Sequence, residues 1–288
     1  IGAVGLSPVA DRLARPALES ADAIVLAGYD PIEMRIGWRD PFPAGVPVIE
    51  VIAEATPHGM HRADVSLVGP IGPVLDALAA ALPHRTAAPA FAGIGEAFRA
   101  AFAAPAAWGP GRAFATLMDL APDTTVVTVD SGAHRILYSQ MARHRRPRSL
   151  LQSSGLCTMG CALPLATGHA LGRPDTPVLA IVGDGCLDMV LGELATLRDT
   201  GARVVVAVMV DASLSLIEMK QRSGGRANAA VDFGASDHAA IARALGGRAW
   251  RVGDEAALAE ATRAAFATRR GFSLIAIDIP RKSYDGTF

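Results

Sequence analysis

The sequence predicts an α/β fold whose main domain is a doubly wound parallel sheet, and two observations carry this prediction. Short runs of valine, isoleucine, alanine and leucine recur along the chain, and helical segments separate them. The runs are nearly continuously apolar, which is typical of parallel strands that helices cover on both faces. Regular alternation of such strands with helices indicates an α/β architecture. The expected strands of the main domain are residues 126–129, 178–182, 204–210, 249–252 and 273–277.

A smaller α/β segment precedes this domain. Its expected elements are strands at 23–28, 46–52 and 63–68 and a helix at 73–82. Residues 84–110 are rich in alanine, proline and glycine, which is typical of a linker, and a short helix is expected near 96–102. We therefore expect an N-terminal domain over 1–83 and the main domain over 111–288.

Composition excludes several classes of function. The 288 residues carry 27 basic and 28 acidic side chains, and this balance argues against a nucleic-acid partner. The apolar runs are far shorter than the roughly 20 residues of a membrane span. The three cysteines do not suggest a disulfide framework or a zinc site, so we expect reduced thiols in a cytoplasmic protein. The basic run at 143–148 is expected to be a solvated loop, with contact to a phosphate or another subunit as the alternative.

The most informative motif is a carboxylate between two glycines. Asp184 follows one expected strand, and Asp211 follows the next. Parallel strands end at the same edge of a sheet, where ligands bind, and two carboxylates there can hold Mg²⁺ with phosphate oxygens. We expect Gly183 and Gly185 to serve turn geometry and to let an anion approach the backbone. A helix from about Cys186 would add oriented N–H groups, so the pattern predicts a metal-bound diphosphate.

This motif resembles the signature of thiamin-diphosphate (ThDP) enzymes. Residues 153–160 read SSGLCTMG and residues 162–164 read ALP, which resembles a segment of the acetolactate synthase-like branch. Residues 129–134, VDSGAH, resemble a second segment of that branch. The resemblance covers roughly 111–279 in the order of the family. It implies a ThDP diphosphate-binding domain in the main sheet.

The resemblance also implies a metal site with three protein ligands. Asp184 and Asp211 would bind Mg²⁺ through their carboxylates, and Ser213 would bind it through its backbone carbonyl. Asp211 stands where the family usually has asparagine, which adds a negative charge beside the diphosphate. Either this charge alters metal or cofactor affinity, or the cation neutralises it.

Met159 corresponds to the apolar wedge that bends the cofactor, although ordinary core packing would explain a methionine there as well. His134 falls in a segment that contacts the diphosphate, but Ala133 replaces the glutamine of acetolactate synthases proper. Lys220 to Arg222 either reach a substrate carboxylate or form an exposed helix face. The expected cofactor-binding residues are His134, Cys157, Thr158, Met159, Gly183, Gly185, Cys186, Leu214 and Leu216.

The glutamate that activates ThDP comes, in this family, from the pyrimidine-binding domain of an opposing subunit. Glu50 and Glu193 match other parts of the family and are not replacements, so we expect no catalytic residue in this chain. Residues 1–83 resemble only the later part of the family's Rossmann-like central domain. The chain is therefore expected to be a fragment, or else a subunit that another chain completes, and to be inactive alone.

The implied partners are a 2-oxo acid and a pyrimidine-binding domain of the same protein or of a partner subunit, within a homodimer or homotetramer. Flavin (FAD) binding stays open. One alternative is a split or altered ThDP enzyme that uses a sulfonated aldehyde, an acyl-CoA or a cyclic diketone. A more distant alternative is a non-enzymatic nucleotide-binding α/β protein. The tail 281–288 is expected either to cover the site or to be disordered.

Overall fold

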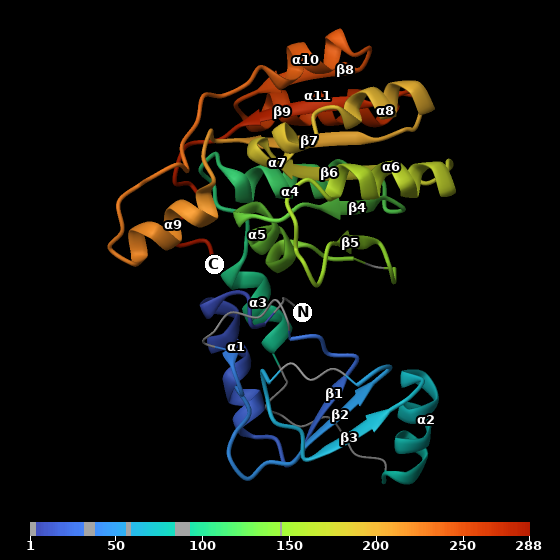
Figure 1. Cartoon of the computed structure of the whole chain (residues 1–288), viewed down its shortest axis with the longest axis vertical. Helices are drawn as coiled ribbons and strands as arrows, with labels where there is room; N and C mark the ends of the chain where they lie inside the picture. The colour runs from blue at the N-terminus through green and yellow to red at the C-terminus, as the bar shows by residue number, and fades with distance from the viewer. Residues whose placement is uncertain (1–3, 32–37, 56–58, 84–92, 145) are drawn as a thin grey trace. The chain divides into compact units, whose positions relative to one another are not determined.

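The computed structural model describes residues 4–31, 38–55, 59–83, 93–144 and 146–288. Residues 84–92 of the expected linker and residue 145 of the basic run lie outside the described residues. The chain divides into two compact units, Ile1–Ala101 and Phe102–Phe288 (Figure 1). Each unit has its own parallel sheet.

The N-terminal unit is a small α/β structure. Its elements are α1 (Pro8–Glu19), β1 (Ile24–Ala27), β2 (Val48–Ile52), β3 (Val65–Val68), α2 (Ile71–Ala81) and α3 (Ile94–Ala101). The strands pair in parallel in the order β1-β2-β3, so the three expected strands and the following helix are present. Ser7 caps α1 by accepting the Ala10 N–H, and α1 packs against α3. A small core of Ile24, Phe42 and Val48 holds the sheet.

The C-terminal unit contains a larger parallel sheet. Its strands are β4 (Val126–Val129), β5 (Leu150–Gln152), β6 (Val178–Gly183), β7 (Val205–Val210), β8 (Arg248–Val252) and β9 (Ser273–Asp278). Its helices are α4 (Pro110–Leu120), α5 (Ala133–Met141), α6 (Ala162–Gly172), α7 (Asp184–Met189), α8 (Glu193–Thr200), α9 (Ser215–Ser223), α10 (His238–Ala244) and α11 (Glu255–Ala267). The strand order is β5-β4-β6-β7-β9-β8, and every described pairing is parallel. The predicted doubly wound α/β fold is confirmed, although the short strand β5 was not expected.

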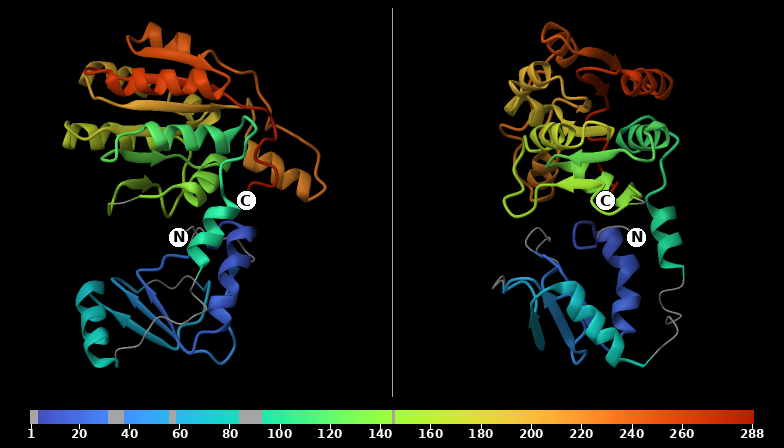
Figure 2. Two further views of the ribbon diagram at one scale, coloured as in Figure 1. Left: turned by 180° about the vertical axis from the view of Figure 1, so that it is seen from behind. Right: turned by 90° about the vertical axis from the view of Figure 1, so that its right-hand side faces the viewer.

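Helices cover both faces of this sheet because its strands are apolar on both sides. In β6, Leu179 and Ile181 pack into a core with α4, α5 and α11, whereas Ala180 and Val182 pack into a second core with α6, α7, α8 and α10. The right-hand view of Figure 2 shows α6 and α8 on one face and α4 and α11 on the other. Among the described residues, no helix is both long and apolar enough to cross a membrane.

The strand order reverses direction at the centre of the sheet. From β4 the chain passes to β5 on one side and then to β6 on the other. In open α/β sheets, ligands bind outside the carboxyl ends of the strands at such a reversal. Asp130, Asp184 and Asp211 directly follow the neighbouring strands β4, β6 and β7 and are all buried. The fold therefore gathers three carboxylates at its ligand-binding edge.

Candidate functional site

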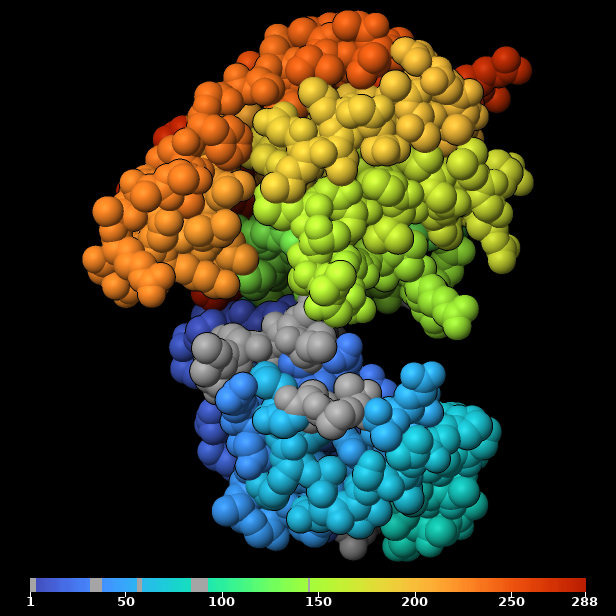
Figure 3. All heavy atoms as spheres, in the orientation of Figure 1, coloured from blue at the N-terminus to red at the C-terminus, as the bar shows by residue number. Residues whose placement is uncertain are grey.

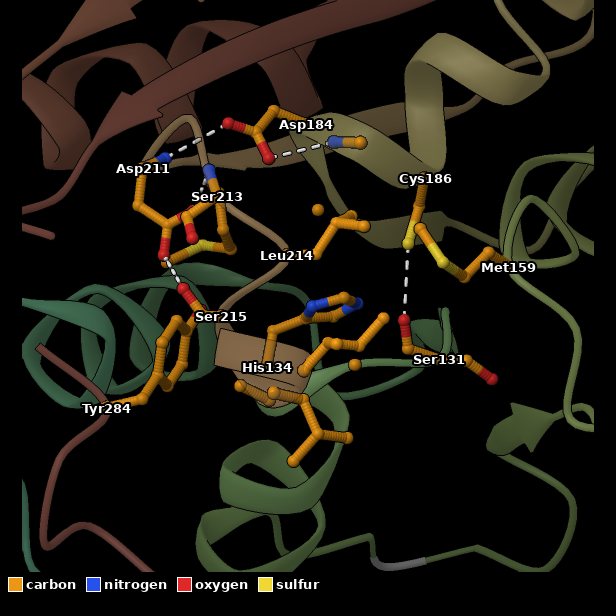
Figure 4. Close-up of a pocket in the computed structure, with 17 residues that line it drawn as sticks. Ser131, His134, Met159, Asp184, Cys186, Asp211, Ser213, Leu214, Ser215 and Tyr284 are labelled. Carbon is orange, nitrogen blue, oxygen red and sulfur yellow. Dashed lines mark hydrogen bonds between the residues drawn. The ribbon is translucent and has the colours of Figure 1, made fainter. Parts of the chain in front are cut away.

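A cavity of about 210 Å³ lies at the carboxyl ends of β4, β6 and β7. Its wall comprises residues 131–134, Met159, 183–186, Met209, Asp211, 213–217 and Tyr284 (Figure 4). Figure 3 shows a hollow between the orange atoms of the α9 region and the green atoms beside them. Segments that are distant in the sequence thus enclose one space at the sheet edge.

Asp184 connects the ends of two neighbouring strands. Its Oδ2 accepts the backbone N–H groups of Asp211 at 3.1 Å and Ala212 at 2.7 Å, and its Oδ1 accepts the N–H of Gly185 at 2.8 Å. The side chain is buried, with 2% of the residue exposed. Burial raises the pKa of Asp184 even though these N–H groups favour the charged form. The carboxylate is therefore held in one orientation but lacks a full counter-charge.

Asp211 is the second buried carboxylate of the cavity. One of its oxygens accepts the N–H of Ser213 at 3.2 Å, and the other accepts the hydroxyl of Ser215 (Figure 4). Burial raises its pKa to about 6, and the negative charge of Asp184 acts in the same direction. Two buried carboxylates that disfavour each other's charge form an arrangement that a divalent cation would stabilise.

The donor set at this edge fits Mg²⁺ better than a transition metal. Among the described residues, there is no group of three or more His, Cys, Asp or Glu side chains that could hold a metal ion. Two carboxylates with a backbone carbonyl would leave coordination positions for phosphate oxygens, which is how Mg²⁺ commonly binds. Ser213 follows Asp211 in the same turn and forms an isolated antiparallel bridge with Asp232, which fixes its backbone.

For Gly183 and Gly185 the structure adds a packing requirement to the roles expected from the sequence. Neither glycine has a left-handed backbone, since Gly183 has a φ of −81° and Gly185 lies within α7. Neither position has room for a side chain. A Cβ on Gly185 would lie 2.9 Å from Leu214 Cδ2, and a Cβ on Gly183 would lie 3.1 Å from the His134 ring. The helix begins at Asp184, two residues before the expected start near Cys186.

His134 lies in the cavity wall at the start of α5. Burial lowers its pKa to about 4, and a hydrogen bond with the backbone of Asp130 acts in the opposite direction. Its buried Nε2 has no hydrogen-bond partner among the described residues. The ring is thus neutral at pH 7, and a polar ligand in the cavity would satisfy this nitrogen.

Met159 lies in the wall because Asp130 holds the segment that follows it. The Asp130 carboxylate accepts the N–H groups of Gly160 at 2.9 Å and Cys161 at 3.4 Å through Oδ1, and that of Ala162 at 3.4 Å through Oδ2. The half-buried Met159 side chain contributes an apolar surface opposite the turn of residues 211–213 (Figure 4). Sequence reasoning missed Asp130, although its place directly after a strand at the same sheet edge was a usable signal.

Of the three cysteine and threonine residues expected to bind the cofactor, one lines the cavity and two do not. Cys186 lines the cavity, and its thiol donates to the Ser131 carbonyl at 3.2 Å. Cys157 and Thr158 are not part of the cavity wall. The Cys157 sulfur contacts the guanidinium of Arg135 and the Ser131 hydroxyl, and Thr158 is exposed.

The segment after Asp211 supplies the apolar side of the cavity. Leu214 and Leu216, both predicted to bind the cofactor, line the cavity. Ser215 and Ile217 line it as well. Arg222 on α9 does not line the cavity; it pairs with Glu218 at 2.9 Å and with Asp285 at 2.7 Å.

The C-terminal tail folds over the site, which decides between the two alternatives for residues 281–288. Tyr284 lines the cavity and is 2% exposed. Arg281 donates to the Ala212 carbonyl at 3.0 Å and pairs with Asp232 at 3.3 Å. Sequence reasoning missed Tyr284, because its place in the wall depends on tertiary contacts and no local pattern indicates it.

Comparison with known proteins identifies the family. A family model described as "Thiamine pyrophosphate enzyme, C-terminal TPP binding domain" matches residues 130–277, which contain Asp184 and the turn of residues 211–213. The chain belongs to this family. The resemblance of the sequence to ThDP enzymes is thereby confirmed, since thiamine pyrophosphate and ThDP are one compound.

Several relatives of this ThDP enzyme domain are acetolactate synthases. An acetolactate synthase of Mycobacterium bovis is 30% identical over 217 residues, covering 71% of this chain and 35% of the relative. An acetolactate synthase of Bacillus subtilis is 28% identical over 257 residues, covering 85% of this chain and 45% of the relative. A catabolic acetolactate synthase of Raoultella terrigena is 29% identical over 276 residues, covering 92% of this chain and 48% of the relative. The chain spans less than half the length of each of these relatives.

Proposed function

We propose that this chain is the diphosphate- and Mg²⁺-binding portion of an enzyme that decarboxylates a 2-oxo acid and passes the product to an acceptor. The observation that carries the proposal is the pair of buried carboxylates, Asp184 and Asp211, at the carboxyl ends of adjacent strands. Their raised pKa values mark a site that lacks positive charge. Acetolactate synthase relatives point to the 2-oxo acid class.

When bound, ThDP supplies the nucleophilic carbon and the electron sink that a 2-oxo acid needs to lose carbon dioxide. Asp184, Asp211 and the backbone carbonyl of Ser213 would hold the cation. The Asp184 carboxylate fixes the turn of residues 211–213, the proposed metal turn, through the N–H groups of Asp211 and Ala212, so the turn is preorganised. Met159, Leu214 and the other apolar residues of the cavity wall would exclude water from the bound cofactor.

His134 would act at the diphosphate. In the neutral ring one nitrogen carries a proton, and the hydrogen bond with the Asp130 backbone engages one side of the ring. Negative charge beside the buried Nε2 would favour a second proton there, which converts this atom into a donor for a phosphate oxygen. The low pKa of His134 in the ligand-free protein is therefore compatible with a charged His134 ring when the diphosphate is bound.

The assembled enzyme would also need parts outside the described site. We propose that the activating glutamate comes from a pyrimidine-binding domain of the same protein or of a partner subunit, in a homodimer or homotetramer. We further propose that residues 1–83 are part of a central domain and that 84–110, whose helix α3 packs against α1 of the N-terminal unit, lead from it to the ThDP domain. The cleavage-and-transfer activity would then require this assembly.

The test is a decarboxylation assay on the chain alone and together with a glutamate-bearing pyrimidine domain. We expect ThDP-dependent release of carbon dioxide from pyruvate only when both parts are present. Turnover by the isolated chain would refute the requirement for the second domain. Turnover of a sulfonated aldehyde, an acyl-CoA or a cyclic diketone in place of every 2-oxo acid would assign the altered substrate class instead.

A further inference from the structure

The last ten residues of the chain form a strap beside the cavity. After β9, the Ile279 N–H donates to the Val210 carbonyl at 3.0 Å, which brings the strap to the end of β7. Successive turns follow, in which Asp285 donates to Lys282 at 3.0 Å and Thr287 donates to Tyr284 at 3.1 Å. Figure 1 shows this red segment beside α9.

Two arginines hold the strap to the ThDP domain. Arg281 donates to the Ala212 carbonyl at 3.0 Å, so one end of the strap is tied to the metal turn. Asp285 pairs with Arg222 of α9 at 2.7 Å, so the other end is tied to the helix that follows this turn. These two contacts flank Tyr284, which enters the cavity between them.

The Tyr284 side chain is unusual for a buried phenol. It lines the same cavity as Asp184 and Asp211 (Figure 4). Its buried hydroxyl has no hydrogen-bond partner among the described residues. Leaving such a group unsatisfied destabilises the folded state. Burial and the charges of Asp211 and Asp184 raise its pKa well above the usual range, so the hydroxyl keeps its proton and can donate.

We propose that Tyr284 is a further binding residue of this site and that its hydroxyl donates a hydrogen bond to an anionic oxygen of the diphosphate–metal unit. The proposal rests on the proposed ThDP function. A diphosphate bound beside Asp184 and Asp211 would bring oxygens that can accept a hydrogen bond from the unsatisfied Tyr284 hydroxyl. Its ionised oxygens cannot donate one, so the hydroxyl would be the donor. Tyr284 thereby links the C-terminal strap to cofactor binding.

The test compares Tyr284→Phe with the wild-type protein by calorimetric titration of ThDP at saturating Mg²⁺. A hydrogen bond to a charged group is worth about 1.5–3 kcal/mol, so the Kd of the variant should rise about 10-fold to 150-fold. The variant without ligand should also melt at a higher temperature, because it no longer buries an unsatisfied hydroxyl. Tyr138→Phe is the matched control, because Tyr138 is equally buried but lies outside the cavity.

Each outcome decides the proposal. A wild-type Kd in Tyr284→Phe, whether or not its melting temperature falls, would overturn the proposal and leave the hydroxyl with a structural role. Equal losses of affinity in Tyr284→Phe and Tyr138→Phe would also overturn it, because the effect would then not be specific to the cavity. If the wild-type protein shows no Mg²⁺-dependent ThDP binding, the proposed function itself fails, and this inference fails with it.

Discussion

The Asp184 carboxylate accepts the backbone N–H of Ala212 at 2.7 Å, which joins the end of β6 to the turn after β7. Ala212 has a left-handed backbone, with a φ of 53°, a conformation that non-glycine residues rarely adopt. Local strain of this kind persists only where surrounding contacts enforce it. Asp184 supplies that contact, so the residue that would bind the metal also shapes the turn that carries the second ligand.

Asp211→Asn should stabilise the cation-free protein at neutral pH. The folded-state pKa of about 6 lies above the ordinary 3.8, so stability from Asp211 is fully present below pH 3.8 and is lost as pH rises through 6. The variant should gain up to about 3 kcal/mol of unfolding free energy at pH 7.5 and much less at pH 4. Urea denaturation at both pH values measures this difference. Asp119→Asn, which removes an exposed carboxylate outside the cavity, is the matched control.

His134→Gln should make the ligand-free protein less sensitive to acid. The folded-state pKa of about 4 lies below the ordinary 6.5, so stability from the neutral ring is present above pH 6.5 and is lost as pH falls through 4. The unfolding free energy of the wild-type protein should fall up to about 3 kcal/mol further than that of the variant over this range. Parallel stability curves for the two proteins would contradict the prediction.

Asp130→Ala should destabilise the ThDP domain and loosen the segment around Met159. The change removes the acceptor for the N–H groups of Gly160 and Ala162, and each buried donor left unsatisfied costs about 1–3 kcal/mol. We expect a loss of roughly 2–5 kcal/mol by urea denaturation and faster proteolysis within 153–160. Asp130→Asn keeps one acceptor oxygen and should lose less. Equal losses in both variants would argue against this role.

Much of the fold and part of the site follow from local patterns. Apolar strands such as Val178–Gly183 predict a parallel sheet, and a parallel sheet requires Asp184 and Asp211 to meet at one edge. The reason for Gly185 was not predictable, because it depends on a contact with Leu214 across the cavity.

Tertiary folding determines the remaining parts of the site. Tyr284 reaches the cavity only because the strap folds back and Arg281 binds the Ala212 carbonyl. The short strand β5 was missed because its three residues are too few to give a periodic signal.

The most direct test of the ThDP–Mg²⁺ site is thermal denaturation with ThDP and Mg²⁺, together and separately, for the wild-type protein and Asp184→Asn. Binding to the folded state alone adds about 2.7 kcal/mol at a ligand concentration 100 times the Kd. We predict this stabilisation for the wild-type protein only when both ligands are present, and none for Asp184→Asn. Equal stabilisation of both proteins, or none of the wild-type protein, would contradict the assignment of the site to Asp184 and Asp211.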